Sequence, residues 1–132
     1  MDVKQLNGLT LAYLGDAVYE LYIRKHIVSK GYTKVNALHK KVIEYTSGNA
    51  QSLMIHYLLK ENVLSDDEIA IFKRGRNSHV NSSRKNISLG DYLDATGFEA
   101  LIGYLYISDN IFRLEEIIAL LINYKEGGQE ND

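Results

Sequence analysis

The stretch LAYLGDAVYE, residues 11–20, decides the fold and contains an anomaly. Leu11, Leu14 and Val18 recur at helical spacing, which predicts an amphipathic helix over residues 9–29. Gly15 and Asp16 interrupt this pattern, because both are poor helix formers and a central glycine costs about 1 kcal/mol relative to alanine. Their presence calls for a close neighbour or a chemical role.

Helical spacing predicts five further helices, over residues 35–45, 50–60, 66–77, 92–107 and 111–124. The fourth begins with a capping box, in which Ser65 is followed by Glu68. Residues 77–90 are rich in Ser, Asn and Gly and predict a loop. No segment of useful length alternates apolar and polar residues as a half-buried strand does. We therefore expect an all-α domain over residues 1–125, followed by a flexible tail over residues 126–132.

Composition sets limits on the class of protein. The chain has 132 residues, 45% of them hydrophobic, which suits one domain with one core. It contains no cysteine, which excludes disulfides and thiolate metal sites. The first ten residues lack the pattern of a signal peptide, and no apolar run is long enough to cross a bilayer. We expect a soluble protein of the cytoplasm with no membrane association.

One segment is basic although the formal net charge is −2. No acidic residue interrupts residues 73–85, and the side chains there are of the kinds that contact phosphates and sugar hydroxyls. The candidate phosphate-contacting residues are Lys73, Arg74, Arg76, Asn77, Arg84 and Lys85. Lys73 and Arg74 have an alternative role, since cations in the last turn complement the helix dipole. That alternative leaves the other basic residues unexplained, so contact with a polyanion is favoured.

Two carboxylates are candidates for chemistry. Asp16 has small helical neighbours in Ala12 and Gly15, with Glu20 one turn further on. Glu99 lies in FEALIGYLYI, again among small residues. If the two helices pack together, the carboxylates converge and need a cation or a shared proton. Oxygen ligands without His or Cys favour Mg²⁺, with Mn²⁺ as an alternative. Ordinary surface acids, or a helix-capping role for Glu99, are equally open on spacing alone.

The same two segments resemble the signature motifs of ribonuclease III endonuclease domains. LAYLGDAVYE resembles the motif in which an aromatic residue precedes Leu-Gly-Asp, and FEALIGYLYI resembles the later Glu-Ala-Leu-Ile-Gly motif. Both occur in the family's order, and the resemblance covers nearly the whole chain. The short length and the KRGRN segment before a basic loop are similar to the mini-ribonuclease III subfamily.

This resemblance implies an all-α homodimer that cleaves double-stranded RNA with Mg²⁺. In the mini subfamily it implies maturation of the 5′ and 3′ ends of the 23S ribosomal RNA precursor. By position, Asp16 matches the family's metal-binding aspartate and Glu99 its catalytic, metal-binding glutamate. Tyr13 matches the aromatic residue at the dimer interface.

The sequence also departs from the larger enzymes of that family. Ala12, Leu9 and Thr96 stand where those enzymes carry acidic residues, so we expect weak metal binding in the absence of RNA. These departures motivate an alternative, a catalytically silent RNA-binding module of the same fold. A helical adaptor that binds other proteins is a third hypothesis.

Overall fold

A computed structural model describes residues 1–78 and 87–127. The described chain forms six α-helices after a short 3₁₀ helix and contains no strand, which confirms the all-α prediction. The helices are α1 (Gly8–Ser29), α2 (Val35–Thr46), α3 (Gly48–Lys60), α4 (Asp66–Arg76), α5 (Leu89–Ile107) and α6 (Ile111–Glu126), and the 3₁₀ helix is η1 (Val3–Gln5). None of the described helices combines the length and apolar character needed to cross a membrane.

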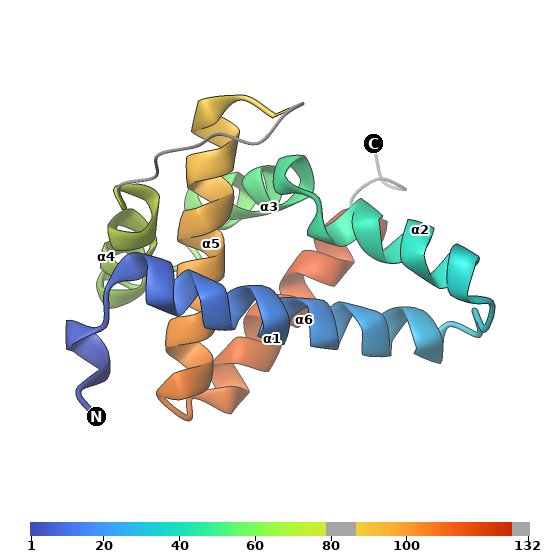
Figure 1. The fold of residues 1–132 in the computed structure, drawn as a ribbon, viewed down its shortest axis with the longest axis horizontal. Helices are drawn as coiled ribbons and strands as arrows, with labels where there is room; N and C mark the ends of the chain where they lie inside the picture. The colour runs from blue at the N-terminus through green and yellow to red at the C-terminus, as the bar shows by residue number, and fades with distance from the viewer. Residues whose placement is uncertain (79–86, 128–132) are drawn as a thin grey trace.

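Helix α5 is the centre of the fold. It packs most extensively against α1, which crosses it, and also against α3, α4 and α6 (Figure 1). The large apolar side chains in the middle of α5 are buried, among them Phe98, Leu101 and Leu105. Phe98 meets Tyr19 of α1 edge to face, with ring centroids 4.9 Å apart. Helices α1 and α5 thus form the most extensive helix contact of the described chain.

Serine caps move two helix starts ahead of their predicted positions. Ser47 Oγ accepts from the amide of Ala50, so α3 starts at Gly48 rather than at residue 50. Ser88 caps α5 in the same way, and that helix starts at Leu89 rather than at residue 92. The capping box of Ser65 is present as predicted. Both serines lie in Ser- and Gly-containing segments whose composition is typical of loops, and here each serine starts a helix.

Glu126 corrects the predicted start of the tail. It belongs to α6, and its carboxylate lies 2.8 Å from His26 Nε2 and 3.0 Å from Lys30 Nζ. It also accepts a hydrogen bond from the Tyr45 hydroxyl. Burial raises the pKa of Glu126, but these hydrogen bonds outweigh burial and lower the pKa to about 2. Glu126 thus joins the end of α6 to α1 and α2; residues 128–132 of the predicted tail lie outside the described part.

Candidate active site

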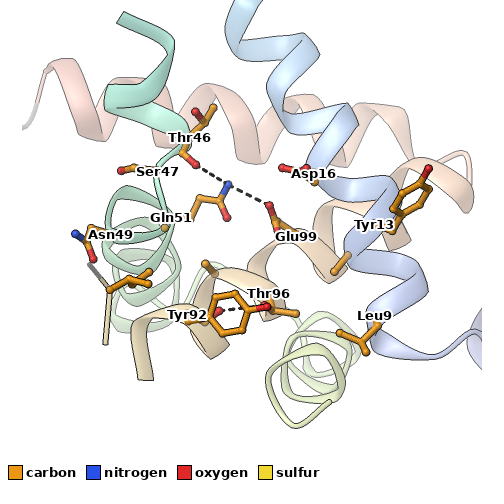
Figure 2. Close-up of a pocket in the computed structure, with 14 residues that line it drawn as sticks. Leu9, Tyr13, Asp16, Thr46, Ser47, Asn49, Gln51, Tyr92, Thr96 and Glu99 are labelled. Atoms are coloured by element: carbon orange, nitrogen blue, oxygen red, sulfur yellow. Dashed lines mark hydrogen bonds between the residues drawn. The ribbon is translucent and has the colours of Figure 1, made fainter. Parts of the chain in front are cut away.

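A pocket of about 470 Å³ opens between α1, α5 and the junction of α2 with α3. Asp16 and Glu99 both line it, from α1 and α5, so the structure brings the two predicted carboxylates into one site (Figure 2). The remaining lining residues are mostly small or uncharged: Leu9, Ala12, Tyr13, Thr46, Ser47, Gly48, Asn49, Gln51, Ile87, Tyr92, Ala95 and Thr96.

A glycine contact between α1 and α5 places these carboxylates together. A Cβ atom on Gly15 would lie 1.7 Å from the carbonyl oxygen of Glu99. One turn away, a Cβ atom on Gly103 would lie 2.0 Å from the carbonyl oxygen of Leu11. The two backbones therefore touch, and only glycine fits at either position. This contact explains the anomaly at Gly15, and it holds Asp16 beside the backbone that carries Glu99.

The described lining of the pocket carries a small negative charge that comes from carboxylates alone. Asp16 and Glu99 are the only charged side chains among its described lining residues. Within the described ranges, no group of three or more His, Cys, Asp or Glu side chains forms a metal cluster. Oxygen donors with a formal charge of −2 nevertheless fit a hard divalent cation such as Mg²⁺, which keeps much of its water and needs only one or two carboxylates. The donor set suits Mg²⁺ or Mn²⁺ better than zinc.

The departures from the larger enzymes lie in the wall of this pocket. Leu9, Ala12 and Thr96 all line it, so acidic residues at these positions would face the same space. Thr96 is occupied locally, because its hydroxyl donates to the carbonyl of Tyr92 at 3.0 Å. The substitutions noted in the sequence thus make this pocket less negatively charged than it would be with acidic residues at the three positions.

Gln51 of α3 is a site residue that sequence reasoning missed. It is buried, and its Nε2 donates to the carbonyl of Thr46 at 3.2 Å and to Glu99 Oε2 at 3.4 Å. Its Oε1 is buried and has no hydrogen-bond partner among the described residues. A glutamine within an amphipathic helix gives no signal of its own, since its role depends on α3 packing against α5.

Two other residues of α1 that the sequence singles out, Glu20 and Tyr13, lie outside the pocket or at its edge. Glu20 does not line this pocket; it pairs with Arg24 on the same helix and borders a different groove, beside α2. Tyr13 lies at the pocket edge with 85% of its surface exposed. An aromatic side chain so exposed is available for contact with another molecule.

The structure gives two of the basic candidates intramolecular partners. Arg74 donates to the carbonyl oxygens of Lys4 and Leu6, at 2.7 and 3.1 Å, and so ties the N-terminal segment to α4. Arg76 donates to Asp94 Oδ1 at 2.6 Å, a structural role that the sequence did not indicate. Lys73 and Asn77 are exposed.

The remaining candidates in the basic segment, Arg84 and Lys85, lie outside the described residues. Phosphate contact by any residue of this segment therefore stays a prediction.

The described chain is thus an all-helical domain whose pocket, at the crossing of α1 and α5, is lined by two carboxylates. The family model described as "Ribonuclease III domain" matches residues 9–110 of this chain. The chain therefore belongs to the ribonuclease III family, and it is an endoribonuclease of that family. The family acts on double-stranded RNA and is generally metal-dependent.

Individual relatives extend this comparison to nearly the full chain. A Clostridium tetani protein named Mini-ribonuclease 3 is 52% identical, over 99% of this chain and 86% of its own length. A Streptococcus pneumoniae protein of the same name is 44% identical, over 96% of this chain and 99% of its own length. A crystal structure of a Fusobacterium nucleatum protein matches with a TM-score of 0.83 and 32% identity, covering 92% of this chain and 96% of that one.

Proposed function

We propose that this chain is a Mg²⁺-dependent endoribonuclease that cleaves double-stranded RNA in the cytoplasm and matures both ends of the 23S ribosomal RNA precursor. The observation that carries the proposal is the placement of Asp16 and Glu99 in one pocket at the crossing of α1 and α5. The relatives named Mini-ribonuclease 3 support the substrate, since they match almost the entire chain.

In the proposed mechanism Asp16 and Glu99 would together hold the cation next to the scissile phosphate. When bound, Mg²⁺ makes water a stronger nucleophile and offsets the negative charge that develops on the phosphate. The chain's contribution is a fixed helix separation, because the contacts at Gly15 and Gly103 hold together the two backbones that carry the carboxylates.

The small charge of the pocket supports a division of labour between protein and substrate. Two carboxylates balance one divalent cation, and RNA phosphates can supply further oxygen ligands. A site of this kind binds the cation weakly by itself and more tightly with duplex RNA present, by thermodynamic linkage. The exposed Lys73 and the other basic side chains of residues 73–85 would grip the RNA backbone without reading its sequence.

We also propose that the chain acts as a homodimer through the face of α1 that carries Tyr13. Tyr13 is 85% exposed, and its neighbour Leu9 is 43% exposed on the same stretch of helix. Exposed aromatic and aliphatic side chains beside an active site favour an interface with a second chain. Sedimentation of Tyr13→Ala against the unmodified protein tests this, and an unchanged oligomeric state would refute the assignment of Tyr13.

The deciding experiment compares Asp16→Asn with Glu20→Gln in a duplex cleavage assay. Loss of a single outer-sphere partner in a metal site already costs about 10–100-fold, so Asp16→Asn is expected to lose about a hundredfold or more. Glu20→Gln is the matched control, since Glu20 lies one turn away, outside the pocket. Wild-type cleavage by Asp16→Asn would refute the assignment. Duplex binding without cleavage by the unmodified protein in Mg²⁺ would favour the catalytically silent module.

A further inference from the structure

The Gln51 side chain combines two features that a packing residue does not need. Its Nε2 reaches across from α3 to Glu99 Oε2 at 3.4 Å, and Figure 2 shows the side chain pointing toward Glu99. Its Oε1 is buried from solvent and accepts no hydrogen bond within residues 1–78 and 87–127. An unpaired buried oxygen costs about 1–3 kcal/mol. A hydrophobic side chain of the same length would avoid that cost if packing were the only requirement.

The hydrogen-bond partners fix the orientation of the amide. Both atoms that face Nε2 are acceptors, namely the Thr46 carbonyl oxygen and a carboxylate oxygen of Glu99. A flipped amide would set Oε1 against two other oxygens, which is repulsive. Gln51 therefore bridges the end of α2 and Glu99. Its amide nitrogen donates to both, and its amide oxygen accepts no hydrogen bond among the described residues.

From this arrangement we propose that Gln51 is a positioning residue, which holds the Glu99 carboxylate in the orientation that binds the catalytic cation. The proposal rests on the proposed function, and it adds a third residue to a site whose charge comes from only two described side chains. A neutral amide suits this task, because it restrains Glu99 without a positive charge that would compete with the cation. A lysine or arginine at the same place would neutralise the carboxylate.

The test uses Gln51→Met, which keeps the length of the side chain but removes the donor. We expect the Mg²⁺ concentration for half-maximal duplex cleavage to rise about threefold to tenfold, the equivalent of one lost hydrogen bond, while KM for the duplex stays the same. The matched control is Ser52→Ala, on the adjacent residue of α3. Ser52 is also buried and donates to Asp91, but it does not line the pocket.

A second variant and a second readout keep the proposal independent of folding and of catalysis. Gln51→Glu places a carboxylate within about 3.4 Å of Glu99, where two negative charges repel each other unless a cation compensates. In chelator, we expect the melting temperature of Gln51→Glu to be lower than that of the unmodified protein. Adding Mn²⁺ should raise the melting temperature of Gln51→Glu by more than it raises that of the unmodified protein. For Gln51→Met, the rise on adding Mn²⁺ should be smaller than for the unmodified protein.

The outcomes separate the two proposals. Unchanged Mg²⁺ dependence in Gln51→Met, or an equal loss in Ser52→Ala, overturns the positioning role while leaving the nuclease assignment intact. Equal Mn²⁺-induced shifts in all variants overturn it as well. If the unmodified protein does not cleave duplex RNA at all, the proposed function fails, and the thermal shifts with Mn²⁺ still decide whether Gln51 acts on a cation site.

Discussion

Replacing Gly15 with alanine tests the packing that creates the site. The added Cβ would lie 1.7 Å from the Glu99 carbonyl oxygen and 2.7 Å from the amide nitrogen of Gly103, where ordinary contact begins at 3.4 Å. Both neighbours are backbone atoms of α5, so no side-chain rotation can relieve the overlap. To reach ordinary contact the two helices must separate by about 1.7 Å, the difference between 3.4 Å and the 1.7 Å at Glu99.

The size of the effect follows from this displacement. Overpacking in a core costs about 1–3 kcal/mol, and contact against a rigid backbone places Gly15→Ala near the upper end. For a domain of this length, a loss of that size lowers the melting temperature by about 10 °C. Because a shift of about 1 Å in a catalytic group can cost about 100-fold in rate, cleavage should fall more than stability alone explains.

Gly90→Ala is the control, since it makes the same substitution in the first turn of α5. No heavy atom of the described residues lies within 4 Å of a Cβ at that position, so alanine should raise stability by up to about 1 kcal/mol through helix propensity. Melting is followed by circular dichroism, and cleavage is measured below the melting range. A Gly15→Ala protein that melts and cleaves like the unmodified chain would show that the glycine contact is not needed.

Two further predictions concern charge. Since the pKa of Glu126 is lowered from 4.5 to about 2, the stabilisation it provides is complete above pH 4.5 and is lost as the pH falls toward 2. A pH series of melting temperatures should therefore show a smaller acid loss for Glu126→Gln than for the unmodified protein, and parallel curves would contradict this. In duplex binding, phosphate contact by all five basic residues of residues 73–85 corresponds to a slope of log K against log salt of about −4.5, and Lys73→Ala should reduce the size of that slope by about 0.9. Lys34→Ala should leave the slope unchanged. Lys34 directly precedes α2, and α2 and α4 lie on opposite sides of the molecule (Figure 1).

Periodic sequence patterns predicted the elements of this fold better than their ends. The apolar spacing of α1 is regular because its buried residues, from Leu11 to Ile27, recur at intervals of three or four, whereas α5 is buried on most sides between Asp94 and Leu105. The starts of α3 and α5 were misplaced, since Ser47 and Ser88 cap helices within segments whose composition is typical of loops. The end of α6 was misplaced for a different reason. Glu126 is held by side chains of α1 and α2, which are distant in sequence.

The site was predictable to the extent that its residues carry charge. Asp16 and Glu99 drew attention because carboxylates among small residues are unusual, and the structure places both in one pocket. Gln51 and Arg76 show what the sequence alone does not predict. One is a neutral residue whose Nε2 bridges Thr46 and Glu99, and the other pairs with Asp94, across α4 and α5. Both roles arise from contacts between helices, which the spacing within a single helix does not reveal.

The glycine contact joins the stability of this protein to its chemistry. A glycine in mid-helix weakens the isolated helix by about 1 kcal/mol, yet here Gly15 and Gly103 allow two backbones to touch at the point where the carboxylates emerge. Larger side chains at either position would set α1 and α5 further apart and would also separate Asp16 from Glu99. The spacing of the carboxylates is therefore fixed by residues that carry no functional group. The same reasoning applies to a substitution that adds a carboxylate to the pocket, at Ala12 or Thr96. Such a substitution increases the negative charge of the pocket. It leaves the spacing of α1 and α5 unchanged only if the helix contact at Gly15 and Gly103 is kept.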